Sequence, residues 1–216
     1  FILVKGIILN FRPKKSAAAY KKIWWKEGSP LIVLSQRLFD KVKQLITIPA
    51  ALAMRYGSIS IYNGIHELDK QGVDEIIVLP LYPHYAMSSY ESVVVKVEEE
   101  ILKNFSHIKT KVIPAFYNDP LYLKAMINNI KSHLKDIDYD YLLFSYHGLP
   151  ESHLRISDPT NFHCQGNTCC EKGSVAHNTC YKHQVFETTK EIAKALNLKE
   201  GSYSNAFQSR LANEPW

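Results

Sequence analysis

The chain has 216 residues, of which 46% are hydrophobic and 22% are charged, and its formal net charge is +5. This composition is that of an ordinary globular protein with room for a hydrophobic core, in one large domain or two small ones. No apolar run approaches the roughly 20 residues of a membrane span, and the start lacks the pattern of a secretory signal, which favours the cytoplasm.

Helical and strand-like periodicities alternate along the chain. Apolar residues at helical spacing predict helices that end at Pro49 and at Gly72, and Asp119 followed by Pro120 predicts the start of a third. Ser88-x-x-Glu91 reads as a capping box that opens another helix. In chain order we expect helix 38–46, a short strand at 50–56, helix 61–68, strand 73–79, helix 88–101, strand 111–116, helix 120–134, strand 141–146, a polar loop at 151–179, helix 181–196 and strand 202–208.

This alternation predicts an α/β fold in which helices cover parallel sheets. We place a boundary near residue 118, which gives an amino-terminal α/β half over 1–118 and a carboxyl-terminal half over 119–216. Two halves of this kind usually hold their ligand in the cleft between them.

The segment 142–150, LLFSYHGLP, carries the clearest chemical signal. Its apolar start predicts a buried strand, which Gly148 and Pro150 end, so His147 lies at the carboxyl end of that strand. Open α/β sheets bind their ligands at this end, and a histidine there can bind a metal or move a proton near neutral pH. A lone histidine at a strand end is nevertheless more often structural.

Two further segments combine aromatic and polar residues. Residues 80–89, PLYPHYAMSS, follow a predicted strand, and their aromatic rings and helix-start donors suit a flat aromatic ligand with anionic groups. Basic residues gather at 12–22, just before Trp24 and Trp25, where they suit phosphates, a membrane surface or a carboxylate-bearing substrate. Packing aromatics and a solvated helix face are the simpler interpretations of the two segments.

All four cysteines, Cys164, Cys169, Cys170 and Cys180, fall in one predicted loop. Clustered cysteines indicate a metal or iron–sulfur site in a reducing compartment rather than a disulfide framework. Four thiolates suit a [2Fe–2S] cluster or a structural zinc equally well, and the nearby His163, His177 and His183 leave a mixed Cys/His zinc site open. Unligated buried thiols are the remaining alternative.

Motifs for competing chemistries are absent from the sequence. It contains no G-x-G-x-x-G, no P-loop, no G-x-S-x-G elbow and no H-E-x-x-H. The basic surface is also too narrow to predict nucleic-acid binding.

The chemistry-bearing segments, taken together, resemble those of the ferrochelatases, which insert ferrous iron into a porphyrin at the end of haem synthesis. The matching stretches occur in the family's order over nearly the whole chain: RPKKSAAAYKKIWWKEGSPL, ALAMRYG, VLPLYPHYAMSS, LLFSYHGLPESHL and YSNAFQSRLANEPW. The resemblance implies two Rossmann-like halves with the porphyrin in the cleft between them.

The resemblance also assigns roles to single residues. It makes His147 the histidine that faces the porphyrin centre, either as a ligand for the incoming Fe²⁺ or as the acceptor of pyrrole protons. The remaining matches lie in the family's substrate-binding segments and pocket wall: Tyr20, Lys21, Ser29, Tyr82, Ser89 and Trp216.

The chain departs from the family pattern at both ends and at its cysteines. The family's partner glutamate lies beyond Trp216, and its first strand lies ahead of Phe1, so we expect this piece alone not to chelate iron. Some ferrochelatases hold a [2Fe–2S] cluster with one internal cysteine and three near the carboxyl end, but Met87 stands at that internal position. We therefore expect the four cysteines at 164–180 to hold a cluster within one loop, with structural zinc as the alternative.

The resulting hypothesis is a lyase of haem biosynthesis whose partners are ferrous iron and a porphyrin, either protoporphyrin IX or coproporphyrin III. Two alternatives stay open. One is a non-catalytic metal or iron–sulfur protein on a chelatase scaffold, and the other is a chelatase for a different metal or tetrapyrrole. The sequence leaves the oligomeric state and peripheral membrane contact open.

Overall fold

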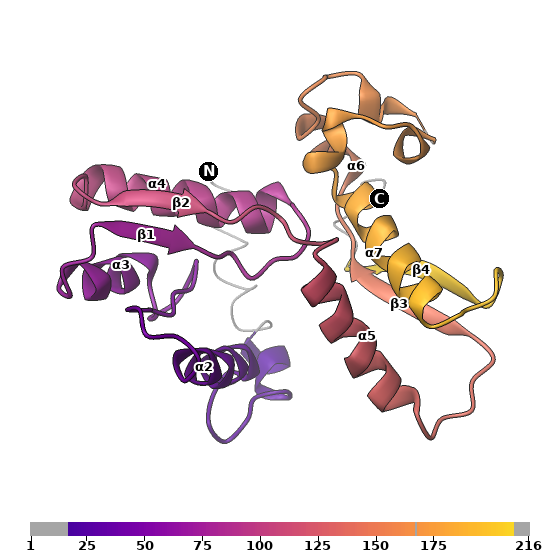
Figure 1. The fold of residues 1–216 in the computed structure, drawn as a ribbon, viewed down its shortest axis with the longest axis horizontal. Helices are drawn as coiled ribbons and strands as arrows, with labels where there is room; N and C mark the ends of the chain where they lie inside the picture. The colour runs from indigo at the N-terminus through magenta and orange to yellow at the C-terminus, as the bar shows by residue number, and fades with distance from the viewer. Residues whose placement is uncertain (1–16, 167, 210–216) are drawn as a thin grey trace. The chain divides into compact units, whose positions relative to one another are not determined.

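The computed structural model describes residues 17–166 and 168–209, and its chain forms two compact units, residues 1–73 and 74–216. Figure 1 shows the course of the chain through its helices and strands. None of the helices in these described ranges is both long and apolar enough to cross a membrane. The boundary predicted near residue 118 stays a prediction.

The first unit contains α2 (Pro30–Lys43) and α3 (Ile61–Asp69). α2 begins with proline at its first position, as the fixed φ of that residue favours, and none of its residues is buried. The hydroxyl of Ser60 accepts a hydrogen bond from Asn63 N–H and caps α3. Ile61 and Ile65 are buried on the inner face of that helix.

Residues 50–56 do not form the predicted strand. Their apolar composition suits a strand, but the described residues give them only an isolated parallel bridge between Met54 and Ser60. This segment instead runs close to α3, where a Cβ on Gly64 would lie 3.2 Å from the Cβ of Ala53. Glycine therefore permits the close approach of the segment to the helix.

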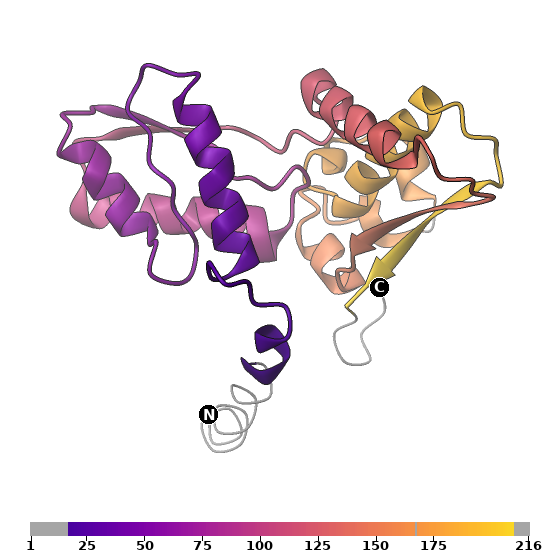
Figure 2. The ribbon, with the colours of Figure 1, turned by 90° about the horizontal axis from the view of Figure 1, so that it is seen from below.

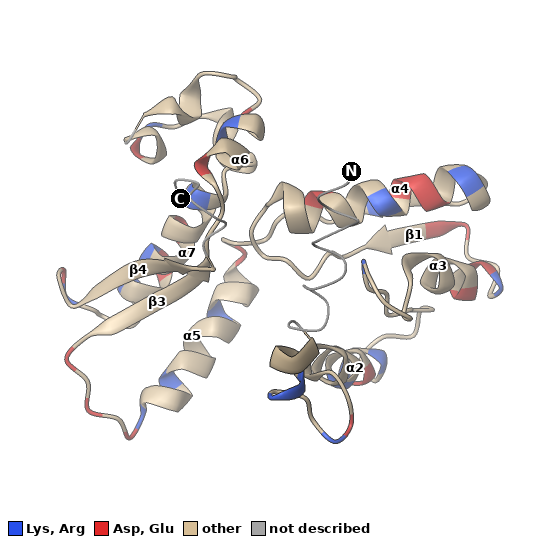
Figure 3. Ribbon diagram, turned by 180° about the vertical axis from the view of Figure 1, so that it is seen from behind, with Lys and Arg blue, Asp and Glu red and all other residues tan. Residues whose placement is uncertain are grey.

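The second unit opens with a βαβ arrangement. β1 (Glu75–Val78) pairs in parallel with β2 (Lys109–Val112), and α4 (Ser92–Asn104) connects them. Acidic and basic residues alternate along α4 (Figure 3), where Lys96 pairs with Glu99 and Glu100 at 3.2 and 2.8 Å.

The helix after β1 starts differently from the prediction. A π-helical turn, Met87–Glu91, precedes α4, and Glu91 N–H donates to Ala86 O across this wide turn. Neither Ala86 nor Glu91 provides a side-chain cap, so the predicted Ser88–Glu91 capping box is wrong. π-turns often occur where a helix carries functional residues.

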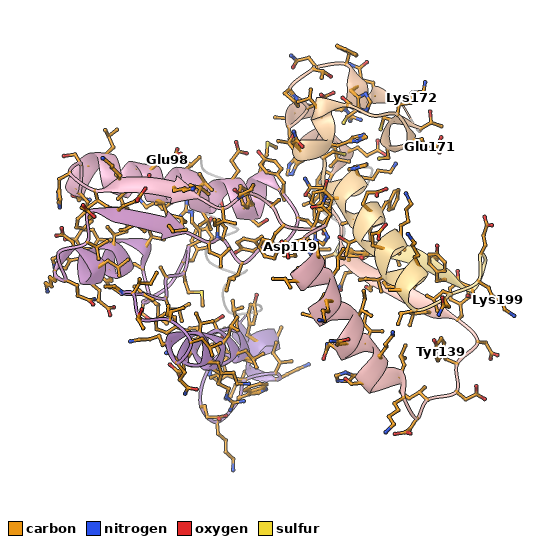
Figure 4. The ribbon with its side chains drawn as sticks, in the orientation of Figure 1. Glu98, Asp119, Tyr139, Glu171, Lys172 and Lys199 are labelled. Atoms are coloured by element: carbon orange, nitrogen blue, oxygen red, sulfur yellow. The ribbon has the colours of Figure 1, made fainter. Side chains whose placement is uncertain are left out.

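A second parallel pair completes the unit. β3 (Leu142–His147) aligns with β4 (Tyr203–Gln208) so that Leu142 faces Tyr203 and His147 faces Gln208. α5 (Pro120–Leu134) and α7 (Tyr181–Ala195) lie on the same side of this pair (Figure 2). Asp119, at the start of α5 (Figure 4), accepts the N–H groups of Leu121 and Tyr122, as predicted for a helix cap.

Short helical turns interrupt the predicted polar loop between β3 and α7. These are α6 (Glu151–Ile156) and 3₁₀ turns at His163–Gln165, Cys169–Glu171 and Val175–Asn178. The strands of the described residues thus run parallel in pairs with helices between them. The predicted α/β class is confirmed.

Candidate functional site

His147 is the last residue of β3, at the carboxyl end of the β3–β4 pair. Exposure alternates along β3, and His147 lies on the same exposed face as Leu143 and Ser145. Gly148 N–H donates to Gln208 O at 2.8 Å, so the strand pairing continues past His147 and fixes its backbone. The imidazole therefore stands on a rigid element at the sheet edge where parallel sheets bind ligands.

The loop after β1 reaches this strand through His84. The His84 ring meets the rings of Tyr146 and Tyr181 edge-on, with centroids 5.8 Å apart in both pairs. Its Nε2 lies 3.0 Å from Thr188 Oγ1. Burial lowers the pKa of His84 to about 4, so the ring is neutral at pH 7. Segment 80–89 thus packs against Tyr146, the residue that precedes His147.

α7 supplies buried hydroxyl groups beneath the same strand. Thr189 donates to Asn205 Oδ1 at 2.7 Å, and the hydroxyl of Tyr146 therefore donates to Thr189 Oγ1 at 2.8 Å. Burial raises the pKa of Tyr146 and keeps its phenol protonated. These hydrogen bonds join β3, β4 and α7 directly behind the exposed face that carries His147.

The polar residues of α7 are not among the residues predicted from the sequence. Gln184, Thr188 and Thr189 are all buried, on the same stripe as Val185 and Ile192. A glutamine and two threonines at helical spacing among apolar core positions were the available signal. Buried polar groups of this kind need partners, which here come from distant loops and strands.

The substrate-binding residues predicted from the resemblance are distributed over both units. Tyr20, Lys21 and Ser29 belong to the first unit, where Tyr20 is exposed and Ser29 directly precedes α2 without capping it. Tyr82 is an exposed residue of the loop after β1, and Ser89 lies half-buried in the π-turn. Trp216 lies outside the described residues.

A buried carboxylate holds the start of the cysteine loop, residues 157–180. Asp158 Oδ2 accepts Cys164 N–H at 2.9 Å, and its Oδ1 accepts both the N–H and the hydroxyl of Thr160. Burial opposes ionisation of Asp158, but the hydrogen bonds from Cys164 and Thr160 outweigh it and the pKa stays below its ordinary value. Asp158 therefore fixes the backbone at the first cysteine.

Histidines hold the middle of the loop. His163 Nε2 lies 2.9 Å and His177 Nε2 3.4 Å from the carbonyl oxygen of Cys169. The His177 ring stacks on His183, with centroids 3.6 Å apart. Nδ1 of His183 is buried and has no hydrogen-bond partner, and burial followed by the neighbouring His177 lowers the pKa of His183.

The four thiols are free and interact with one another. Cys180, buried immediately before α7, is hydrogen-bonded to Cys170, and this bond lowers the pKa of Cys180 to about 6. Burial, followed by the neighbouring Cys180, raises the pKa of Cys164 to about 12. Cys180 is therefore more readily ionised than Cys164 or Cys170, whose pKa values are raised.

A cavity of about 100 Å³ lies beside the cysteine loop. Cys164, Cys169 and Cys180 line part of it, together with Lys182 and the ion pair of Arg155 with Glu151. Glu171 and Lys172, which follow Cys170, are exposed on the outside of the loop (Figure 4). No group of three or more His, Cys, Asp and Glu side chains in the described ranges is arranged as around a metal ion. The loop thus provides suitable donors without the geometry of a coordinated ion.

Comparison with known proteins connects this chain to one family. A sequence model of the family described as Ferrochelatase matches residues 1–216. The ferrochelatase of Opitutus terrae is 42% identical over 218 residues, which cover 100% of this chain and 63% of that protein. Those of Stutzerimonas stutzeri and Pseudomonas fluorescens (strain Pf0-1) are 41% and 42% identical over 217 residues. The chain spans 63% of the length of each of these curated relatives.

Proposed function

Because this chain belongs to the ferrochelatase family, we propose that the protein carrying it inserts ferrous iron into a porphyrin. The observation that carries the proposal is the place of His147. It stands on the exposed face of β3 at the carboxyl edge of a parallel pair, with its backbone fixed by pairing to β4. A reaction at the centre of a flat ring needs such a fixed group.

The chemistry accounts for a histidine there. A free-base porphyrin loses two N–H protons and accepts Fe²⁺, so the products are the iron porphyrin and two protons. A neutral imidazole can ligate the incoming metal or accept a pyrrole proton. We propose His147 for this work in either role.

The porphyrin itself needs aromatic contacts and donors for its carboxylates. We propose that Tyr82 and Trp216 contact the ring and that hydroxyl and ammonium groups of Tyr20, Lys21, Ser29 and Ser89 bind its edge. Support comes from the match of these residues to the family's segments. The packing of segment 80–89 on Tyr146 adds support for Tyr82 and Ser89.

An anaerobic assay of the full-length protein tests the proposal and identifies the ring. Ferrous iron is mixed with protoporphyrin IX or coproporphyrin III, and the iron porphyrin is followed by its absorbance. We expect turnover with at least one of the two rings. Absence of insertion with both, in protein that binds either ring, would favour the non-catalytic alternative or a different metal.

We further propose that Cys164, Cys169, Cys170 and Cys180 hold a [2Fe–2S] cluster. The support is a set of four free thiols and a cavity whose lining includes Cys164, Cys169 and Cys180. When bound, such a cluster would supply one-electron chemistry or a structural cross-link of the loop. Residues of the loop position the cysteines: Asp158 at Cys164, and His163 and His177 at Cys169.

Metal analysis separates the cluster from its alternative. We expect the anaerobically purified protein to be coloured and to contain about two iron atoms and two sulfide ions per chain. Stoichiometric zinc without colour would contradict the cluster and favour a Cys/His zinc site. The buried, unpartnered Nδ1 of His183 is the observation that keeps zinc as the alternative.

A further inference from the structure

Gln184 lies where the cysteine loop, α7 and the loop after β1 meet. Its side chain is fully buried. Its Oε1 accepts Tyr85 N–H at 2.7 Å, from a segment 99 residues away in sequence. Its Nε2 donates to the carbonyl oxygens of His177 and Asn178, at 3.1 and 2.9 Å. One planar amide therefore bonds to both loops at once.

The next turn of α7 repeats this connection. Thr188 Oγ1 lies 2.9 Å from the carbonyl of Tyr117 and 3.0 Å from that of Gln184, and His84 Nε2 reaches the same hydroxyl. The Thr188 hydroxyl has a single proton, which it donates to a carbonyl oxygen. It can therefore only accept from His84, so Nε2 of the neutral ring is the donor. Successive residues of the loop after β1, His84 and Tyr85, are thus held by α7 residues one turn apart.

We infer that Gln184 is a positioning residue that couples the order of the cysteine loop to the conformation of the loop after β1. In treating residues 80–89 as porphyrin-binding, the inference rests on the proposed function. Its physical basis is that one planar amide is hydrogen-bonded both to the cysteine loop and to the loop after β1. If the carbonyls of His177 and Asn178 move away, Nε2 loses both of its acceptors in a buried site, and the amide must rotate to find others. When the amide rotates, Tyr85 N–H loses its hydrogen bond to Gln184 Oε1.

Thermodynamic linkage gives the inference a consequence in each direction. Loss of order at the cysteines loosens the segment that we assign to the porphyrin. If order in the cysteine loop raises the affinity for the porphyrin by some factor, porphyrin binding must favour the ordered cysteine loop by the same factor. The coupling requires no direct contact between the thiols and the ring.

Hydrogen exchange of the Tyr85 amide in the full-length protein tests the coupling without measuring turnover. The cysteine loop is perturbed by replacing Cys169→Ser and Cys170→Ser together. Exchange at Tyr85 should become about two- to tenfold faster, the range expected for the loss of one buried hydrogen bond. The exchange of β2, residues 109–112, should stay unchanged and serves as the internal reference.

Variants of two glutamines show whether the effect passes through residue 184. Gln184→Met should accelerate exchange at Tyr85 by itself, and adding the two serine substitutions should then change it little further. Gln71→Met is the control, because Gln71 is an exposed glutamine outside the cysteine loop whose side chain bonds locally to Glu67 O. It should leave the exchange at Tyr85 as in the wild type.

Two results would overturn the inference. In the first, the serine substitutions speed exchange within 163–180 but leave Tyr85 unchanged. In the second, β2 speeds up as much as Tyr85, which would show general loosening instead of coupling. Both comparisons use proteins with Gln184 intact, so they hold even if Gln184→Met does not fold. Failure of iron insertion with intact exchange coupling would reject the proposed function and leave this inference standing.

Discussion

His84 is half-buried and Asp158 is buried; both titratable side chains hold loops in place, and burial affects their charge differently. His84 has one hydrogen-bond partner at Nε2 and aromatic neighbours, so desolvation dominates and the ring stays neutral. Asp158 receives hydrogen bonds from the backbone N–H groups of Cys164 and Thr160 and from the Thr160 hydroxyl, so its charged form persists although the side chain is buried. At neutral pH, neutral His84 therefore connects the loop after β1 to α7, and ionised Asp158 holds the turn between Asp158 and Cys164.

The lowered pKa of His84 predicts a loss of stability in mild acid. Between about 6.5, the value in the unfolded chain, and about 4, the unfolded state binds more protons than the folded state. The free energy of unfolding should therefore fall as the pH drops through this window, by up to about 3 kcal/mol from His84. Urea unfolding at several pH values measures it.

The variant His84→Gln isolates this contribution, because glutamine can still donate to Thr188 but does not titrate. It should flatten the pH dependence between 6.5 and 4, whereas His133→Gln, an exposed histidine of α5, should leave it unchanged. An unaltered slope in His84→Gln would show that other groups cause the acid sensitivity.

Asp158→Asn should loosen the start of the cysteine loop. The amide nitrogen of asparagine cannot accept the N–H of Cys164, so one of the charge-assisted hydrogen bonds is lost at a cost of about 1.5–3 kcal/mol. We expect faster loss of bound metal to a chelator and faster alkylation of Cys164. The exposed Asp138→Asn is the control, and equal rates in both variants would contradict a positioning role for Asp158.

Among the elements, α7 is bonded to several others in the second unit through buried polar side chains. Its buried stripe bonds to the loop after β1 through Gln184 and Thr188, and to β3 and β4 through Thr189. A helix with polar groups in its core stripe is stable only where every one of them is satisfied. α7 therefore fixes the positions of its neighbours as well as covering the sheet.

Thr189→Val tests this role of α7. The substitution keeps the shape of the side chain but leaves Tyr146 without its acceptor and Asn205 Oδ1 without its donor. Unsatisfied groups of this kind should lower the free energy of unfolding by about 2–4 kcal/mol in denaturant titrations. Thr110→Val, on exposed β2, is the matched control and should change it by less than about 0.5 kcal/mol. An equal loss of stability in Thr189→Val and Thr110→Val would contradict the role proposed for Thr189.

The elements with strong local signals could be predicted from the sequence. The capped start of α5, the stop of α3 near Gly72 and the strand end at His147 each follow from a residue with a fixed backbone preference. Where the local sequence signal was misleading, a competing interaction determined the local structure. Glu91 N–H bonds to Ala86 O in a π-turn rather than entering a capping box, and residues 50–56 pack beside α3 without a partner strand.

The contacts that build the site could not be predicted. His84 meets Thr188 across 104 residues and Tyr85 meets Gln184 across 99, and no local pattern specifies which distant polar groups pair. Sequence could flag Gln184 as a buried polar residue on α7, but its partners depend on the topology. The family resemblance identified the segments, and the fold of the second unit brought one of them, residues 80–89, against β3.

For the molecule as a whole, the residues matched to the family's binding segments divide between the two units. Tyr20, Lys21 and Ser29 lie in the first, whereas the second contains His147, the loop after β1 and the cysteines. The second unit by itself links the cysteines to the proposed catalytic strand through α7. In the function that we propose, β3 presents His147 to the porphyrin.

Replacement of His147 by alanine tests that claim most directly in the full-length protein, with iron insertion and porphyrin binding measured side by side. We predict that kcat falls by about 100-fold or more, while the dissociation constant of the porphyrin changes by less than about threefold. His133→Ala, an exposed histidine of α5, should leave both unchanged. Iron insertion by His147→Ala at the rate of the wild type would contradict the account.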